Sequence, residues 1–235
     1  MQAVFLDACG VLYRRQRRYR YLLAFLRRRR LPVPTPAELQ GIRERIKRQV
    51  PAADRDARYD AFLLALSVSD PASRADGRRV LWQEAGEISL FPEVPETLRT
   101  LKARGFKLGV ITNTTRTSLQ KRRWLENSGI DVPFDSFIAS CEVGVAKPHQ
   151  RIYELALAQC QVSPGASLFV GHEETELMGA RAVGMKTIAF GSAAEAGDEY
   201  IARFAELLEL PYLQSPSRAG SVWTSRRLAN APLIR

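Results

Sequence analysis

Three polar features of this chain come directly after short apolar runs. Asp7 follows AVFL, Thr112 follows KLGVI, and a turn at Gly171 follows SLFV. Continuous apolar runs of this length, bounded by turn residues, are typical of strands buried on both faces of a parallel sheet. Ligands bind beyond the carboxyl ends of such strands. We therefore expect these three features at one rim of a sheet, where the carboxylate of Asp7 looks like the start of an enzyme site.

Helical patterns lie between these apolar runs. Residues 93–105, 117–129 and 174–184 each end at a glycine after a basic or polar last turn, and 148–160 opens with a proline at an expected first helical position. A fourth apolar run, KTIAF, precedes Gly191. Alternating strands and helices indicate right-handed βαβ units. The sequence therefore predicts an α/β fold with a doubly wound parallel sheet.

Residues 14–90 break this alternation. Their apolar residues recur three and four positions apart, and no strand pattern is convincing. We therefore expect a helical cap inserted into a core domain that consists of residues 1–13 and 91–213. The last segment, 214–235, is rich in Ser, Arg and Pro and is expected to be an extended basic tail.

The composition favours a globular protein. The 235 residues are 46% hydrophobic, which suffices for one large domain or for a core with a smaller insertion. No apolar run approaches the roughly 18 residues of a membrane helix, and the N-terminus lacks the order of a signal peptide, so we expect no membrane association and a cytoplasmic location. Cys9, Cys141 and Cys160 are far apart without a CxxC pair, which favours reduced thiols.

The net charge of +10 is concentrated in two segments. Residues 14–90 hold 18 Lys and Arg against 9 Asp and Glu, and residues 214–235 hold four basic residues and no acidic ones. The arginines can steer an anionic small molecule, form a solvated helix face, or bind an acidic protein or a nucleic acid. The sequence leaves these three possibilities open.

Four motifs, in the order DACGVL, ITNTT, VAKPHQRIYELAL and VGHEETELMGARAVGM, resemble those of the haloacid dehalogenase-like (HAD) hydrolase superfamily, in its branch with a helical cap after the first strand. The resemblance covers residues 1–213. It implies a hydrolase, in particular a phosphatase that forms an aspartyl intermediate at Asp7 on an anionic small molecule. Thr112 would bind a phosphate oxygen, and Lys147 would keep Asp7 ionised. The expected substrate-binding residues are Gly10, Arg14, Arg18 and Asn113.

Two parts of the chain depart from the pattern of the family's phosphatases. Cys9 stands where a second aspartate usually serves as acid and base, and a thiol with a reference pKa of about 8.5 is a poor replacement. His172 stands where an aspartate usually holds Mg²⁺, an ion that prefers oxygen ligands. The resemblance still implies a Mg²⁺ cofactor. Its expected ligands are Asp7, His172, Glu173 and Glu176, with Cys9 counted among the catalytic residues.

Two alternatives to a phosphatase remain open. A HAD scaffold with a degenerate metal site could be a binding protein that engages an acidic partner or nucleic acid through its arginines. Covalent chemistry at carbon needs no second aspartate, and the superfamily's dehalogenases lack it, although this chain departs from their pattern at the last turn. His172 and Glu176 are then the candidates for the base that activates water.

Overall fold

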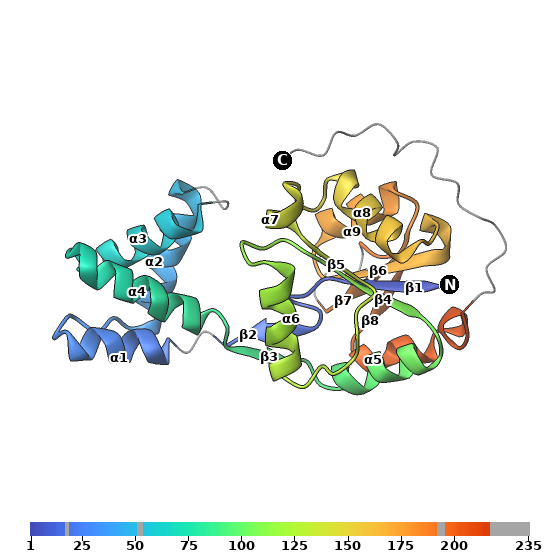
Figure 1. Cartoon of the computed structure of the whole chain (residues 1–235), viewed down its shortest axis with the longest axis horizontal. Helices are drawn as coiled ribbons and strands as arrows, with labels where there is room; N and C mark the ends of the chain where they lie inside the picture. The colour runs from blue at the N-terminus through green and yellow to red at the C-terminus, as the bar shows by residue number, and fades with distance from the viewer. Residues whose placement is uncertain (17–18, 51–53, 192–195, 217–235) are drawn as a thin grey trace. The chain divides into compact units, whose positions relative to one another are not determined.

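The computed structural model describes residues 1–16, 19–50, 54–191 and 196–216. The chain forms two compact units (Figure 1). We call Met1–Leu12, Phe91–Asn113 and the residues from Gly129 onward the core unit, and Tyr13–Leu90 with Thr114–Ser128 the helical unit. From residue 217 onward the predicted basic tail lies outside the described residues, and so does Arg18.

A six-stranded parallel sheet forms the centre of the core unit, with the strand order β5-β4-β1-β6-β7-β8. The observed sheet confirms the predicted α/β fold with a parallel sheet. The apolar runs in the sequence correctly predicted four of its strands. These are β1 (Ala3–Leu6), β4 (Lys107–Thr112), β6 (Ser167–Gly171) and β7 (Lys186–Phe190). The sequence did not predict the two edge strands, β5 (Ser136–Ala139) and β8 (Glu199–Ile201).

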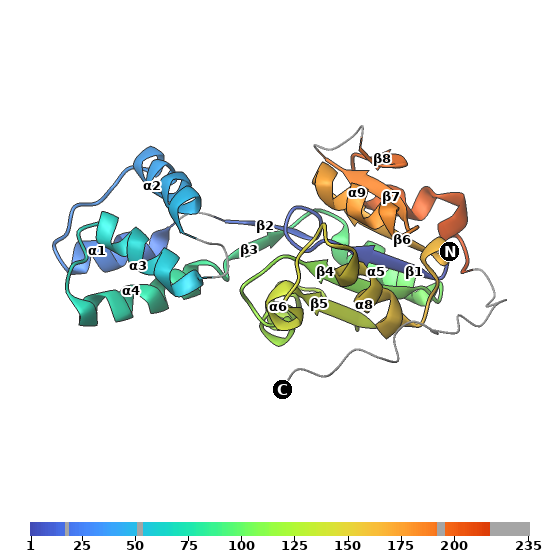
Figure 2. The same ribbon diagram turned by 90° about the horizontal axis from the view of Figure 1, so that it is seen from above.

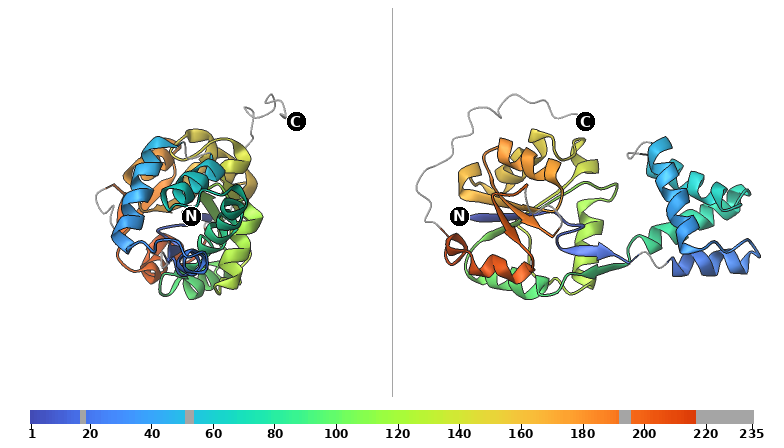
Figure 3. Two further views of the ribbon diagram at one scale, coloured as in Figure 1. Left: turned by 90° about the vertical axis from the view of Figure 1, so that its left-hand side faces the viewer. Right: turned by 180° about the vertical axis from the view of Figure 1, so that it is seen from behind.

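Helices cover both faces of this sheet (Figure 1, Figure 3). On one face, α8 (Gln150–Cys160) and α9 (Glu174–Ala182) pack against the strands and against each other. On the other, α5 (Val94–Ala103) packs with the 3-10 helix η2 (Phe204–Glu209). The short elements are α7 (Ser140–Val143), η1 (Pro164–Ala166) and η3 (Pro211–Leu213). The sheet is therefore buried on both faces, which explains its continuous apolar runs.

The predicted helix ends are confirmed, but one predicted start is wrong. The helices α5, α6 (Ser118–Asn127) and α9 each end two residues before the glycine at which the sequence predicted their end, which is Gly105, Gly129 or Gly184. In contrast, α8 begins at Gln150, and the His149 side chain caps it by accepting from the backbone of Arg151 at 3.2 Å. Pro148 therefore precedes the cap instead of occupying the first helical position. Among the described residues, no helix combines the length and apolar character needed to cross a membrane.

Four consecutive helices form most of the helical unit, and Figure 2 shows them gathered into one bundle. They are α1 (Arg20–Arg28), α2 (Pro36–Gln49), α3 (Arg55–Ala65) and α4 (Pro71–Glu84). Side-chain caps begin the last three, at Thr35, Asp54 and Asp70. Their apolar faces enclose a buried cluster that includes Leu26 and Leu63.

The expectation that residues 14–90 contain no strand is wrong at both ends of that segment. The strand β2 (Tyr13–Arg15) pairs antiparallel with β3 (Ile88–Leu90). Each strand has only three residues, which is too short to show the alternation that marks a strand in a sequence. The pairing also joins residues that are distant in the chain, so no local pattern reports it.

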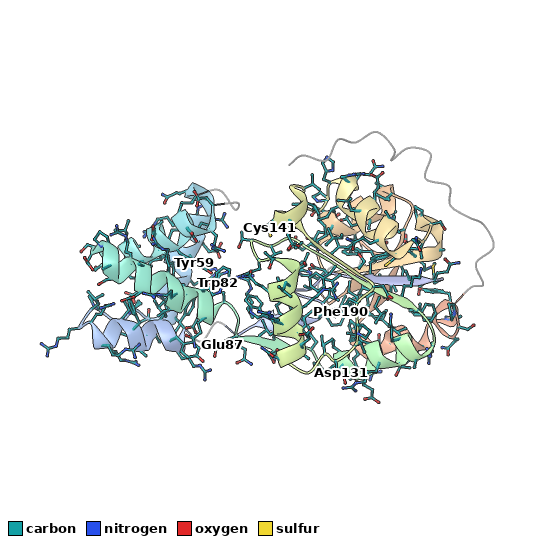
Figure 4. The ribbon with its side chains drawn as sticks, in the orientation of Figure 1. Tyr59, Trp82, Glu87, Asp131, Cys141 and Phe190 are labelled. Atoms are coloured by element: carbon teal, nitrogen blue, oxygen red, sulfur yellow. The ribbon has the colours of Figure 1, made fainter. Side chains whose placement is uncertain are left out.

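Arg116 joins the segment Thr114–Ser128 to the bundle. Its guanidinium lies 2.9 Å from the centroid of the Trp82 ring, and its Nη2 donates to the Tyr59 hydroxyl at 3.2 Å. Figure 4 labels Tyr59 and Trp82 on α3 and α4. Burial lowers the pKa of Arg116 to about 10. A buried guanidinium against aromatic side chains therefore holds this segment on α3 and α4.

Candidate active site

Asp7 lies directly beyond the carboxyl end of β1, between the neighbouring strands β4 and β6. Its backbone N–H donates to the carbonyl of Val170 in β6 at 3.0 Å, so the position of Asp7 is fixed by the sheet. The Asp7 side chain is only 7% exposed. Its Oδ1 lies 2.6 Å from Nζ of Lys147, although the two residues are 140 positions apart.

Lys147 shares its ammonium group between two buried carboxylates. Besides Asp7, Nζ donates to Oε2 of Glu176 at 2.7 Å, and the lysine side chain is fully buried. Asn113 holds the lysine from both sides: its side-chain oxygen accepts from the Lys147 N–H at 2.8 Å, and its amide donates to the Lys147 carbonyl at 3.0 Å. The amide also lies 3.4 Å from Glu176. Asn113, predicted to bind substrate, therefore uses its side chain to position Lys147.

His172 lies against the other oxygen of Asp7. Its Nδ1 is 3.2 Å from Oδ2, but Nδ1 is buried and makes no well-aligned hydrogen bond. We therefore interpret this contact as electrostatic, because the distance suits an ion pair and the direction does not suit a hydrogen bond. The imidazole packs on Gly10, whose φ is +99° and where an added Cβ would lie 2.5 Å from the ring. Only glycine fits at that position.

The charges of this cluster stabilise one another. Burial raises the pKa of Asp7, but the charge of Lys147 and the contacts with His172 and Lys147 outweigh it, so this pKa lies below its usual value. Burial lowers the pKa of Lys147, and the two carboxylates reverse that effect and raise it. The interaction with Asp7 raises the pKa of His172 against the opposing effect of burial. Burial raises the pKa of Glu176. With His172 protonated, two cations balance two carboxylates.

The other predicted site residues differ in their position in the fold and in their exposure. Thr112 ends β4, the strand that pairs with β1, and is 1% exposed. Cys9 is a half-buried free thiol, while Glu173 precedes α9 with its side chain 60% exposed. Arg14 is exposed and belongs to the helical unit. The residues that the structure brings into direct contact are Asp7, Asn113, Lys147, Glu176, and His172 with Gly10. Glu173 joins them at the edge, since its Oε1 lies 3.6 Å from Nε2 of His172.

Sequence reasoning missed the aromatic wall behind Lys147. The hydroxyl of Tyr153, on α8, donates to the Glu176 carbonyl at 2.7 Å. The ring of Phe169, in β6, lies 5.3 Å from the Lys147 ammonium and meets the Tyr153 ring edge to face. The signal that could have revealed Tyr153 is a tyrosine on the apolar face of a helix, since a buried hydroxyl needs a partner.

Asp7, His172 and Glu176 form the candidate metal site. Each offers one ligand atom, and these atoms all lie within 4.8 Å of one another. The set fits Mg²⁺ poorly, because it includes an imidazole and because Lys147 already pairs with both carboxylates. One imidazole with two carboxylates is better suited to Mn²⁺ or Zn²⁺. The chemistry proposed below therefore has no step that requires Mg²⁺.

Replacing His172 by Asp should strengthen Mg²⁺ binding by at least about tenfold, because a carboxylate supplies the oxygen ligand that the imidazole lacks. Isothermal titration calorimetry with MgCl₂ measures the affinity. Glu174→Asp, at an exposed position in the first turn of α9, is the control and should leave the affinity unchanged. If wild type and His172→Asp bind Mg²⁺ equally, His172 does not determine the metal preference of this site.

Comparison with known proteins agrees with this architecture. The sequence profile of the haloacid dehalogenase-like hydrolase family matches residues 1–184. The glyceraldehyde 3-phosphate phosphatase of Methanothermobacter thermautotrophicus is 38% identical over 105 residues, which are 43% of this chain and 45% of that protein. An (S)-2-haloacid dehalogenase of a Pseudomonas species is 36% identical over 97 residues, 41% of each chain. The chain thus spans less than half the length of these curated relatives.

A solved structure extends the likeness to almost the whole chain. A HAD hydrolase from Bacillus subtilis, bound to magnesium, superposes with a TM-score of 0.68 at 18% identity and covers 88% of this chain and 97% of its own. At that identity the likeness shows the fold alone. Family membership follows instead from the profile, which covers more than half of the chain. This protein belongs to the haloacid dehalogenase-like hydrolase family.

Proposed function

We propose that the protein hydrolyses phosphate monoesters of small molecules and uses Asp7 as a covalent nucleophile. The observation that carries this proposal is the 2.6 Å contact between Asp7 and the buried Lys147, which keeps a carboxylate ionised at the rim of the sheet. The name of one relative, a glyceraldehyde 3-phosphate phosphatase, supports phosphorus as the atom attacked.

The reaction takes two steps. An Asp7 oxygen attacks phosphorus, the bond to the alcohol oxygen breaks, and the alcohol leaves with the bonding pair and takes a proton from protonated His172. Water then attacks the phosphorus of the aspartyl phosphate, and its proton passes to His172. The bond between phosphorus and the Asp7 oxygen breaks, which releases inorganic phosphate and restores the Asp7 carboxylate and the protonated His172. The Lys147 ammonium and the Thr112 hydroxyl stabilise the negative charge on the phosphate oxygens.

His172 carries both proton transfers in this scheme, because residue 9 is a cysteine. The imidazole is close enough to serve, since its Nδ1 lies 3.2 Å from the Asp7 oxygen. A well-placed acid and base contributes about 10²- to 10⁴-fold to a rate. Because the carboxylic acid usually found at the position of Cys9 is missing, we expect slower turnover than in a HAD phosphatase with a second aspartate.

One observation favours a second candidate, displacement at carbon. Cys9 removes the usual acid, and a leaving halide needs no proton. Asp7 would attack the carbon that bears a halogen, and the carbon–halogen bond would break to release halide. Water, activated by His172 or Glu176 as base, would then attack the carboxyl carbon of the aspartyl ester. The bond from that carbon to the substrate oxygen would break, the substrate oxygen would take the proton, and the hydroxy acid would leave with Asp7 restored. The (S)-2-haloacid dehalogenase among the relatives supports this candidate.

Two product assays separate these candidates. The purified protein is incubated with phenyl phosphate or with (S)-2-chloropropionate, in Mg²⁺ and in EDTA, and released phosphate and chloride are measured. We expect phosphate release that persists in EDTA, because the proposed steps use Asp7, Lys147, Thr112 and His172 and require no metal ion. Chloride release without phosphate release would replace the first candidate by the second. Release of neither product, even at high protein concentration, would contradict both and favour a binding protein.

A further inference from the structure

The helical unit contains a cavity of its own. Its volume is about 220 Å³, and β2, α2, α3 and α4 contribute its walls. The lining residues that the structure describes all belong to the helical unit. Since a cavity of about 150 Å³ can hold a benzene molecule, this one has room for a small organic ligand with a single ring.

Part of the cavity wall is apolar. Ile46, Phe62 and Leu81 line it and belong to the buried apolar cluster of the bundle. The ring of Tyr19 stacks on Phe62, with centroids 6.3 Å apart and 21° between the ring planes. These side chains favour a ligand with an apolar or aromatic body.

The polar part of the wall is strongly basic. Its arginines are Arg15, Arg43, Arg55 and Arg58, and Glu84 is the one acidic residue among the described lining residues. Arg43 donates to the neutral hydroxyl of Tyr19 at 3.3 Å, and Nε of Arg15 is buried without a hydrogen-bond partner. In the part of the chain that the structure describes, neither Arg15 nor Arg43 pairs with a carboxylate. Their charges are therefore available to an anionic group.

Glu84 presents an unsatisfied acceptor in the same wall. Glu84 is only 6% exposed, and its Oε2 accepts from the backbone of Tyr21 and Leu22 at 2.9 and 3.2 Å. Its other oxygen, Oε1, is buried without a partner. A buried acceptor without a partner is costly, so a ligand that donates to Oε1 would gain that missing bond.

We propose that this cavity binds a small organic anion that carries a ring and a hydroxyl group. The carboxylate or phosphate of the ligand pairs with Arg15 and Arg43, the ring packs on Phe62, and the hydroxyl donates to Oε1 of Glu84. The solvated-face interpretation of these arginines does not account for an apolar cavity beside them. The inference does not depend on hydrolysis at Asp7, because no described residue of the core unit lines the cavity.

Calorimetric titration with mandelate, which has a carboxylate, a hydroxyl and a phenyl ring, tests the proposal on the full chain. Mandelate should bind at least about tenfold more tightly than 1-phenylethane-1,2-diol, which lacks the charge, or lactate, which lacks the ring. Phenylacetate, which lacks the hydroxyl, should bind more weakly by about threefold or more. Equal binding of mandelate and the uncharged diol would overturn the proposal.

Matched variants locate the bound mandelate. Arg43→Gln and Arg15→Gln should each weaken mandelate binding by about tenfold. Arg48→Gln, an exposed arginine on α2 outside the cavity, changes the charge equally and should have little effect. Asp7→Asn should bind mandelate like wild type. Equal weakening by Arg48→Gln, or loss of binding in Asp7→Asn, would refute binding in this cavity, and thermal unfolding checks that each variant is folded.

Discussion

Asp7→Asn should lower the rate of phosphate release from phenyl phosphate by about 10⁴- to 10⁶-fold, because the amide is not a nucleophile and cannot form the aspartyl intermediate. The substitution preserves the shape of the side chain, and Lys147 keeps its 2.7 Å contact with Glu176, so the fold should survive. Steady-state phosphate release measures the rate, and mass spectrometry of acid-quenched protein detects the covalent phosphate in wild type.

The control for Asp7→Asn is Asp131→Asn. Asp131 is an aspartate of the same unit whose side chain is 66% exposed and pairs with Arg99 on the surface. That variant should retain the wild-type rate. Turnover by Asp7→Asn at a rate close to that of wild type would rule out Asp7 as the nucleophile and would require a different catalytic group.

The sequence predicted the central strands of the sheet because a strand that is buried on both faces needs a continuous run of apolar residues, which is visible in the local sequence. The strands Ala3–Leu6 and Ser167–Gly171 contain the apolar runs AVFL and LFV, and every residue in these two strands is buried. The edge strand β8 reads EYI, with a charged residue and an exposed tyrosine, so its sequence resembles that of a loop. This strand lies at the edge of the sheet, where side chains can stay exposed, so its local sequence shows no strand pattern.

The site was predictable as a set of residue types at strand ends, but its contacts were not. The order of the strand-end motifs indicated that Asp7 and Lys147 belong to one site. No sequence pattern showed that Asn113 would bind the backbone of Lys147 on both sides. The contact of His172 with Gly10 likewise depends on where two distant turns meet in space.

The contacts of His172 in the structure suggest a different role from the one predicted from the sequence. From the sequence, His172 was expected to be a poor replacement for the aspartate that usually binds Mg²⁺ in this family. In the structure it lies beside Asp7. When protonated it is the second cation there and offsets the negative charge that Lys147 alone leaves uncompensated. Its raised pKa means that this stabilisation is fully present below about pH 6.5, the pKa of an unperturbed histidine, and is lost as the pH rises through the raised value.

The shared ammonium of Lys147 leads to the largest expected effect on stability. Lys147→Met should lower the free energy of unfolding at pH 7 by about 3–5 kcal/mol, because it leaves Asp7 and Glu176 buried close together without their common cation. Chemical denaturation of wild type and variant measures the difference. Lys186→Met is the control, since Lys186 forms a partly exposed pair with Glu199 and its loss should cost about 1 kcal/mol or less.

The dependence on pH distinguishes this charge effect from a packing defect. In wild type, the lowered pKa of Asp7 gives stability that is present above its unfolded pKa of about 3.9 and is lost as the pH falls through the lowered value. In Lys147→Met, the charge of the lysine no longer offsets burial, so the pKa of each carboxyl rises above its value in wild type. The lost stability is then restored at pH values low enough for the buried carboxyls to take up protons. The deficit of the variant should therefore shrink between pH 7 and pH 4. A deficit that stays constant over this range would mean that lost packing, and not unpaired charge, destabilises the variant.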